Sequence, residues 1–461
     1  MEAESIKQVA EGIRSFLKDN FDRYVRVLSD LVAIPSVSAK GEHMDECARL
    51  VADLLAERGF RVRIARAGGH PAVLGELKGG EKVILLYNHY DVQPPEPLEA
   101  WKHDPFKLTA EDGHLFGRGT ADNKGNIVAR LAALDALEHV LGEVPLTVKF
   151  LVEGEEEIGS PTLPKLVEEN REVLKADGGI WETGYVGRRG ELRIYLGFKG
   201  MLYVELKVRG PSRDVHSGYA PIVPNPIWRL VRLACLLKDP EGRVLIPGFY
   251  EGLAGLGYDA EALLEELPFE EEALKEELGL EKFVGGLTGL EALRQLHLMP
   301  SLNISGIYGG YTGKGGKTVI PSEAGMKIDI RLVPGQDPDE VLGALRAYLA
   351  EKGFGDVELT VHSKYPAGFT RPDEEVVRAS VRAAELVYGV RPALVPLSAG
   401  SGPMYLFTGV LGVPMTGAGV GYYDSRVHAP DENIREADFL KGMEHVALTL
   451  LMFSGDRGAK H

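Results

Sequence analysis

Five short segments carry imidazole and carboxylate side chains of the kinds that bind metal ions. The first, Asn88-His89-Tyr90-Asp91, follows the apolar run 82–87. Because side chains alternate along an extended chain, His89 and Asp91 lie on one side of it. A carboxylate behind an imidazole fixes the tautomer and raises the basicity of a ligand. The segment predicts a metal ligand, His89, oriented by Asp91; a polar turn at the end of a strand is the plainer alternative.

The second segment is a glycine-punctuated loop, GRGTADNKG (117–125), at the start of a helical pattern. A phosphate-binding loop is one interpretation, but the spacing fits neither a Walker A motif nor a dinucleotide fingerprint. Asp122 could serve only as a helix N-cap. Alternatively, its carboxylate could bridge two metal ions.

The third segment is EGEEEIGS (153–160), directly after an apolar run. Its four carboxylates repel one another strongly unless a cation lies between them. One carboxylate could bind metal while its neighbour acts as a base. A solvated acidic turn is the alternative.

Glu182, in IWETG, and His428, in DSRVHAPDENI, complete the set. Alone, each is more often structural. Together with the segments above they supply two imidazoles and three carboxylates, from His89, Asp122, Glu157, Glu182 and His428. Nitrogen and oxygen ligands suit Zn²⁺, with Mn²⁺ or Co²⁺ as alternatives.

These side chains need a scaffold that gathers the ends of strands. Helical periodicity over 5–32, 44–58 and 125–141 alternates with strand-like runs at 61–67, 72–78, 82–92 and 146–153. The run 82–87 is apolar on both faces, as in a sheet covered by helices. We therefore expect an α/β fold with a doubly wound mixed sheet, whose strand ends collect the ligands.

The order of predicted helices and strands changes near residue 200. Strand, helix, strand, strand, helix and strand patterns follow at 201–210, 225–237, 301–311, 325–333, 339–353 and 356–363, which is the order of a ferredoxin-like, split βαβ unit. An acidic helical insertion occupies 240–298. The prediction is a catalytic domain in two parts, 1–197 and 369–461, with an inserted lid or dimerisation domain at 198–368.

The composition limits the partners. The chain has 461 residues and a net charge of −16, which argues against nucleic acid or an anionic membrane surface as a partner. No apolar run reaches the length of a membrane span, and the polar N-terminus lacks a signal-peptide core. Cys47 and Cys235 sit in apolar helical patterns and are expected to be small buried hydrophobes. A cytoplasmic protein is expected.

Seven motifs together make the chain resemble the zinc aminoacylase, carboxypeptidase and dipeptidase family, which includes carnosinase-like dipeptidases, glutamate carboxypeptidases and acetylornithine deacetylases. The resemblance runs almost end to end. The motifs are HYDVQP (89–94), GRGTADNKG (117–125), EGEEEIGS (153–160), DVHSG (214–218), GGKTVIPSEA (315–324), RLVPG (331–335) and HAPDE (428–432).

The resemblance implies two Zn²⁺ ions per subunit, bridged by Asp122 and capped by the other four ligands. It implies a cis peptide between Asp122 and Asn123. Glu156 would be the general base. His216 would stabilise the oxyanion, often from across a homodimer formed by the inserted domain.

Contacts to the substrate are implied in the same way. Arg331 and Thr318 would hold the carboxylate end of the substrate, and Ser401 would contact it from the SAGSGP loop. The sequence pattern agrees for Arg331, because it lies on the polar face of its strand, opposite Ile328 and Ile330. A surface ion pair is the alternative.

The function expected is hydrolysis of dipeptides or short peptides with a free C-terminal carboxylate. An N-acyl amino acid deacylase of the same fold and a non-catalytic ligand-binding member are the alternatives. Two departures bear on the substrate. Glu182 stands where dipeptidases of the family usually carry Asp, and Ser398-Ala399-Gly400-Ser401 replaces a usual Glu-Gly-Gly-Ser loop.

Overall fold

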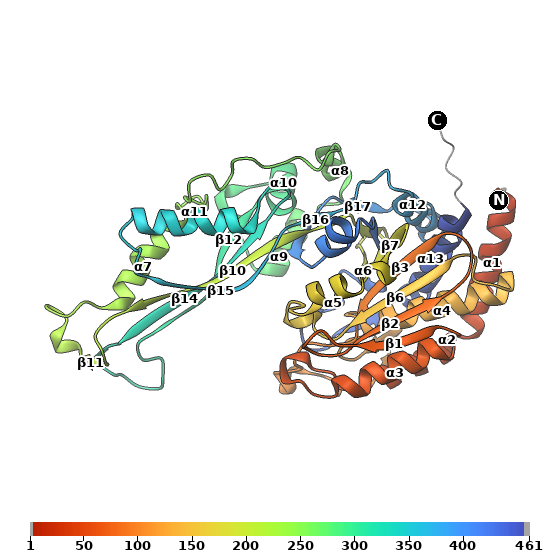
Figure 1. Cartoon of the computed structure of the whole chain (residues 1–461), viewed down its shortest axis with the longest axis horizontal. Coiled ribbons are helices and arrows are strands. Elements are labelled where there is room, and N and C mark those ends of the chain that lie inside the picture. Colours follow the sequence, from red (N-terminus) through yellow and green to blue (C-terminus); the bar gives the residue numbers. More distant parts are fainter. Residues whose placement is uncertain (1–2, 456–461) are drawn as a thin grey trace. The chain divides into compact units, whose positions relative to one another are not determined.

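The computed structural model describes residues 3–455. The chain forms two compact units. Unit 1 contains the residues up to Leu196, Phe369–Val395 and those from Leu406, and unit 2 contains Gly197–Gly368 and Pro396–Tyr405. Figure 1 shows both, with many of the elements labelled.

A six-stranded mixed sheet forms the centre of unit 1, in the order β1-β2-β6-β3-β7-β19. Strands β6, β3, β7 and β19 run parallel, whereas β1 and β2 are antiparallel to their neighbours. The bounds are β1 Arg61–Ala65, β2 Ala72–Leu77, β6 Thr147–Glu153, β3 Val83–His89, β7 Gly178–Trp181 and β19 Met415–Gly417. Nearly every residue of β3, β6 and β7 is buried, so the expected α/β fold with a helix-covered mixed sheet is confirmed.

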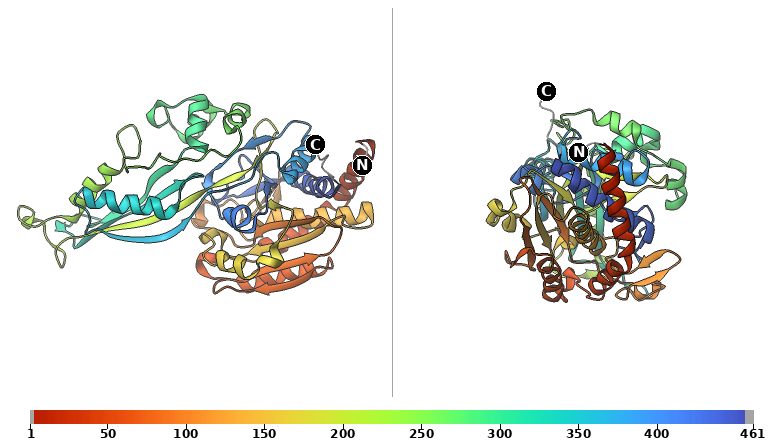
Figure 2. Two further views of the ribbon diagram at one scale, coloured as in Figure 1. Left: turned by 45° about the horizontal axis from the view of Figure 1, so that its top comes forward. Right: turned by 90° about the vertical axis from the view of Figure 1, so that its right-hand side faces the viewer.

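Helices from distant parts of the sequence cover this sheet. Helices α4 (Lys124–Leu141), α12 (Glu375–Tyr388) and α13 (Glu436–Gly455) pack together over β3, β7 and β19, and α3 (Met44–Ala56) packs on β1 and β2. The helical stretch expected at 5–32 forms two helices, α1 (Ala3–Asp19) and α2 (Phe21–Val32). Figure 2 shows α1 beside α13, where Arg14 and Glu444 form an ion pair.

Two small sheets complete unit 1. One has the order β17-β9-β8-β20, with β17 Ala393–Val395, β9 Leu192–Tyr195, β8 Tyr185–Val186 and β20 Gly421–Tyr422. The other has the order β21-β5-β4, with β21 Asn433–Arg435, β5 His114–Phe116 and β4 Thr109–Glu111. The β21–β5 pairing places the chain before Asp122 next to the chain after His428.

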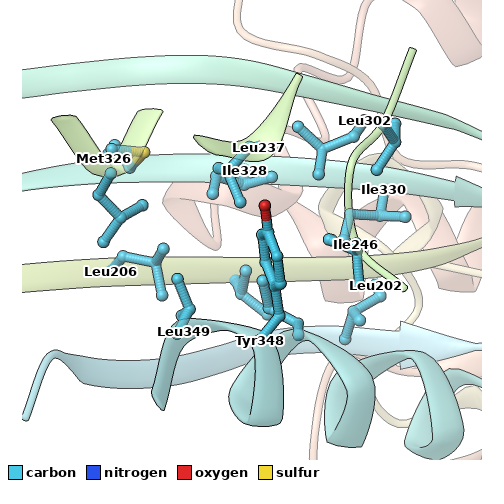
Figure 3. Close-up of a cluster of buried hydrophobic side chains, with 14 of the residues drawn as sticks. Leu202, Leu206, Leu237, Ile246, Leu302, Met326, Ile328, Ile330, Tyr348 and Leu349 are labelled. Carbon is cyan, nitrogen blue, oxygen red and sulfur yellow. The ribbon is translucent and has the colours of Figure 1, made fainter. Parts of the chain in front are cut away.

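Four strands of the sheet in unit 2 form an antiparallel path in the order β12-β14-β10-β15. Its elements follow the chain as β10 Gly197–Arg209, α7 Pro226–Leu237, β12 Ser301–Gly309, β14 Glu323–Leu332, α11 Pro338–Glu351 and β15 Glu358–Tyr365. This is the split βαβ arrangement. Figure 3 shows its core, where Tyr348 and Leu349 of α11 lie over Leu202, Leu206 and Ile328.

The acidic insertion at 240–298 contains three short helices, α8 (Ala260–Glu266), α9 (Glu271–Leu278) and α10 (Gly289–His297). Two details of the sequence interpretation differ from the structure. The segment Pro396–Tyr405 lies in unit 2, because β18 (Ser398–Ser401) pairs with β10. Cys235 is exposed, not buried, since it shares the outward stripe of α7 with Trp228 and Val231. Cys47 is buried as expected.

Among the described residues, no helix combines the length and apolar character needed to cross a membrane.

Candidate metal centre

The candidate ligands meet at the carboxyl ends of three neighbouring parallel strands. His89 ends β3, Glu182 directly follows β7, and Glu157 lies in the short 3-10 turn η3 (Glu156–Ile158) after β6. The register pairs His89 with Glu153, so β3 and β6 end at the same level. Asp122 precedes α4, and His428 lies in the loop before β21. The scaffold therefore gathers all five side chains within unit 1, as the sequence predicts.

Asp122 lies between the two imidazoles. Its Oδ1 is 3.0 Å from Nε2 of His89, and its Oδ2 is 3.2 Å from Nε2 of His428. Each oxygen of one carboxylate thus faces a different histidine.

A second carboxylate accompanies each histidine. Oε2 of Glu182 is 3.3 Å from Nε2 of His89, and Oε2 of Glu157 is 3.0 Å from Nε2 of His428. The ligand atoms of His89, Asp122 and Glu157 all lie within 4.8 Å of one another. The result is two half-sites, one with His89 and Glu182 and the other with His428 and Glu157, which share Asp122.

Hydrogen bonds behind the ligands fix their orientation. Nδ1 of His89 lies 3.1 Å from the carbonyl oxygen of Asp91 and 3.3 Å from its Oδ1. The amide of Asn123 donates to the carbonyl oxygen of Glu182 at 2.9 Å, and Asn88 donates to the amide oxygen of Asn123. The peptide bond between Asp122 and Asn123 is cis, which confirms that expectation.

Burial and like charge shift the protonation of the cluster. Burial, aided by neighbouring carboxylates, raises the pKa of Glu156 and Glu157, and it raises the pKa of Glu182 to about 8. Burial opposes charge on His428, but hydrogen bonds to Asp122 and Glu157 outweigh it and raise its pKa to about 10. Burial also opposes charge on Asp122, but hydrogen bonds to His428 and His89 outweigh it and lower the pKa of that carboxyl. The other carboxyls and His428 thus favour bound protons, which a divalent cation would displace on binding.

The donor set fits such a cation. Within the described part of the chain, Oε2 of Glu182 is buried without a hydrogen-bond partner, although it faces His89. Burying a charged oxygen without a partner is costly unless a cation or a proton compensates it. Each half-site offers one imidazole nitrogen and carboxylate oxygens, the ligand types of catalytic zinc sites. The residues present therefore suit two closely spaced divalent ions.

The acidic turn contains four carboxylates with four different surroundings. Glu153 is buried and accepts hydrogen bonds from the hydroxyls of Tyr87 and Ser160, at 2.6 and 2.9 Å. Glu155 accepts the backbone N–H of His70 at 2.9 Å. Only Glu156 and Glu157 remain for the centre itself. The spacing of the acidic residues could not separate these two from Glu153 and Glu155, because the hydrogen-bond partners that engage Glu153 and Glu155 include residues far away in the sequence.

Gln93 contacts the candidate ligand Glu157, and the sequence analysis did not single it out. Its side-chain amide donates to the carbonyl oxygen of Glu157 at 3.1 Å and to the Oε2 of the same residue at 3.0 Å. The glutamine stands inside the HYDVQP motif, which was the available signal. Glu432, in HAPDE, was likewise not singled out.

The remaining candidate residues lie in unit 2. His216 is exposed at the end of β11 (Val215–His216), and its Nε2 is 3.5 Å from Oγ1 of Thr318. Arg331 lies on the polar face of β14, with Nε 3.5 Å from Oδ1 of Asp329, while the side chains of Ile328 and Ile330 are buried. Oγ of Ser401 donates to the carbonyl oxygen of Gly200 at 2.8 Å.

Lys199 is an unforeseen neighbour of these residues. It is paired with Ser401 in the β10–β18 register and is buried, and its Nζ donates to the carbonyl oxygens of Leu296 and Met299 at 2.8 and 2.6 Å. Burial, together with the nearby Arg331, lowers the pKa of Lys199 to about 8. Sequence spacing gave no signal for it, because a buried lysine is recognised only from its partners.

Comparisons with known proteins agree with this site. A family model described as peptidase family M20/M25/M40 matches residues 85–452. The Cys-Gly metallodipeptidase dug1 of Schizosaccharomyces pombe is 30% identical, with 92% of this chain and 94% of that protein covered.

Solved structures extend the similarity to the fold. An M20 family metallo-carboxypeptidase from Sulfolobus solfataricus, Sso-CP2, superposes with a TM-score of 0.90 at 38% identity, covering 94% of this chain and 99% of that one. Human carnosine dipeptidase 1 gives a TM-score of 0.82 at 27% identity, covering 96% and 99%. The family resemblance seen in the motifs is thereby confirmed. The chain belongs to the M20/M25/M40 peptidase family, and its metallodipeptidase and carboxypeptidase relatives indicate that it is a peptide-bond hydrolase.

Proposed function

We propose that this enzyme is a metallo-exopeptidase that hydrolyses dipeptides or short peptides with a free C-terminal carboxylate. The observation that carries the proposal is Asp122, shared between a His89–Glu182 pair and a His428–Glu157 pair. That arrangement supports two divalent ions with one bridging carboxylate. We propose Zn²⁺ for both, with Mn²⁺ or Co²⁺ as alternatives, on the nitrogen and oxygen donor set.

Bound ions of this kind lower the pKa of a water molecule toward neutrality and polarise a carbonyl oxygen. Glu156 is the proposed general base. It precedes the ligand Glu157 but faces no histidine at ion-pair distance among the described residues, so its carboxylate is available to accept a proton. Burial raises its pKa well above the usual range of a carboxyl, which suits a group that takes a proton and returns it to the leaving amine.

Unit 2 supplies the proposed contacts to the substrate. Arg331 presents its guanidinium on the polar face of β14, where it can bind a carboxylate through two parallel hydrogen bonds. Thr318 and Ser401 are proposed to assist it. His216, exposed at the tip of β11, is proposed to donate to the developing oxyanion, an interaction that typically contributes a few kcal/mol.

The relatives support small peptide substrates. Two of them are named for Cys-Gly and Beta-Ala-His dipeptides, and a third is described as a carboxypeptidase. All of these substrates end in a free carboxylate, which matches the proposed role of Arg331. Glu182 stands where dipeptidases of the family usually carry Asp. For that reason carboxypeptidase and N-acyl amino acid deacylase activity are tested as well.

A homodimer through unit 2 and a cytoplasmic location remain predictions. Strand β12 lies at the edge of its sheet, and Ile307 and Tyr308 on it are 59% and 38% exposed. Such an apolar edge is a liability unless it is covered, which supports pairing with a second copy. Sedimentation equilibrium of the full chain tests this.

The activity is tested with dipeptides, N-acetyl amino acids and C-terminally amidated dipeptides, each with Zn²⁺, Mn²⁺ or Co²⁺. The proposal expects cleavage of dipeptides that is abolished by chelation and restored by metal. Cleavage of acyl amino acids alone would favour the deacylase. A chain that binds metal and ligands but cleaves none of these compounds would favour the non-catalytic alternative.

A further inference from the structure

A buried carboxylate joins the two loops that carry Asp122 and His428. Glu432 is fully buried, and both of its oxygens accept hydrogen bonds. Oε1 accepts the backbone N–H groups of Ala121 and Asp122, each at 3.0 Å. Oε2 accepts the N–H of Gly119 at 3.0 Å and Nη1 of Arg118 at 2.8 Å. Three of the four donors are backbone groups of the segment that ends in Asp122.

The backbone of Glu432 is tied to the same segment. Its carbonyl oxygen accepts the N–H of Gly117 at 2.9 Å, which extends the β21–β5 pairing by one step. The loop therefore folds around the carboxylate from Gly117 to Asp122. Gly119 has φ 91°, a left-handed conformation that lets its N–H point at Glu432 without a Cβ penalty.

On its other side, Glu432 is followed by Asn433, which closes the loop that carries His428. The N–H of Asn433 donates to the carbonyl oxygen of Ser425 at 3.0 Å, and the amide of Asn433 donates to the carbonyl oxygen of Asp431 at 3.0 Å. His428 lies inside this closed loop, four positions before Glu432. A displacement of Glu432 would consequently move His428 relative to Asp122.

A second buried carboxylate in unit 1 shows what a purely structural pair looks like. Glu444 is also buried and forms an ion pair with Arg14, at 2.8 Å. It lies on α13 and accepts hydrogen bonds from that arginine, and among the residues that the structure describes no hydrogen bond joins it to a loop of the metal centre. Glu432 differs in receiving three backbone N–H groups beside a metal ligand.

We propose that Glu432 is a positioning residue that sets the separation of Asp122 and His428, and with it the geometry of the half-site formed by Asp122, Glu157 and His428. The proposal rests on the proposed function, because it assigns that half-site to a metal ion. Replacing a residue that orients a metal ligand through hydrogen bonds typically lowers the metal affinity by about 10–100-fold. Because Glu432 is fully buried, its proposed role is exerted through Asp122 and His428.

The test compares Glu432→Gln with the matched control Glu444→Gln in the full chain. Each apoprotein is titrated with Co²⁺ alone, by calorimetry and by the absorption of the bound ion, and hydrogen exchange is measured over residues 117–122. We expect Glu432→Gln to bind at least one of the two ions about 10–100-fold more weakly, with faster exchange in that segment. Glu444→Gln should bind both ions as the wild type does, with unchanged exchange there.

A Glu432→Gln variant that binds Co²⁺ like the control overturns the proposal. If Glu432→Gln does not fold, Arg118→Met with Glu432→Gln removes the buried charge pair and repeats the comparison. Failure of both variants to fold while Glu444→Gln folds would assign Glu432 to stability and overturn the proposal. A wild type that binds Co²⁺ but cleaves no peptide contradicts the proposed function alone.

Discussion

The backbone N–H of Glu156 donates a 3.3 Å hydrogen bond to Oδ1 of Asp91. The next N–H, that of Glu157, donates to Oδ2 of the same carboxylate at 3.1 Å. Asp91 therefore has two roles: it lies against Nδ1 of His89, as predicted, and it also holds the turn that presents the proposed base and its neighbouring ligand.

Asp91→Asn should lower kcat by about 10–100-fold with a smaller effect on KM, because the amide offers one oxygen in place of two. Steady-state kinetics with a cleaved dipeptide measure this. Asp135→Asn is the matched control, since Asp135 is a half-buried carboxylate of unit 1 paired with Arg58. The control should lose stability but keep kcat, and an Asp91→Asn enzyme with wild-type kcat would refute the role of Asp91.

Arg331→Met should raise KM for dipeptides by about 10–100-fold, the effect of losing hydrogen bonds to a charged group. For C-terminally amidated dipeptides, which lack the carboxylate, the same substitution should change KM little. Arg209→Met is the control, because Arg209 lies on the same sheet and pairs with Glu358 at the surface. Equal losses on both substrate classes would contradict carboxylate recognition.

The stability of the apoprotein should depend on His445 at acidic pH. This histidine is fully buried on α13, and burial lowers its pKa from 6.5 to about 4. Below pH 6.5 the unfolded chain takes up a proton that the folded state resists. The contribution of neutral His445 to the free energy of unfolding is therefore fully present above pH 6.5. It is lost progressively as the pH falls to 4, and the total loss is about 3 kcal/mol.

His445→Gln should remove that part of the pH dependence. The free energy of unfolding, measured with urea between pH 4 and 8, should then decline less steeply below pH 6.5 than in the wild type. His139→Gln, at an exposed position of α4, should keep the wild-type profile. Parallel profiles for the wild type and His445→Gln would refute this assignment.

The sequence could predict that the five candidate ligands meet, because their meeting depends on simple relations. His89, Glu157 and Glu182 follow apolar strands, and parallel strands bring their carboxyl ends to one edge. Asp122 and His428 were identified by residue type and by family motifs. None of this required knowledge of contacts between distant segments.

Other parts of the site depended on such contacts and could not be predicted. Glu153 and Glu155 resemble Glu156 in the sequence, but Tyr87 and His70 engage them from other strands and loops. In the same way, β18 belongs to unit 2 only because it pairs with β10.

Metal removal should destabilise the folded state, because the carboxylates of the centre lose the cation between them. Adding Zn²⁺ to the apoprotein at about 100 times its Kd should add about 2.7 kcal/mol to the free energy of unfolding. Differential scanning fluorimetry with increasing Zn²⁺ detects this as a rising Tm. His428→Ala should reduce the rise, whereas an apoprotein whose Tm ignores Zn²⁺ would contradict the metal centre.

We propose that Glu157 holds an ion while Glu156 moves a proton. Glu156→Gln, assayed with a dipeptide and analysed for bound Zn²⁺ in the same preparation, tests it most directly. We expect wild-type metal content with kcat reduced by about 10²–10⁴-fold, the usual contribution of a general base. A Glu156→Gln enzyme that keeps both its metal and its full kcat would rule out Glu156 as the general base.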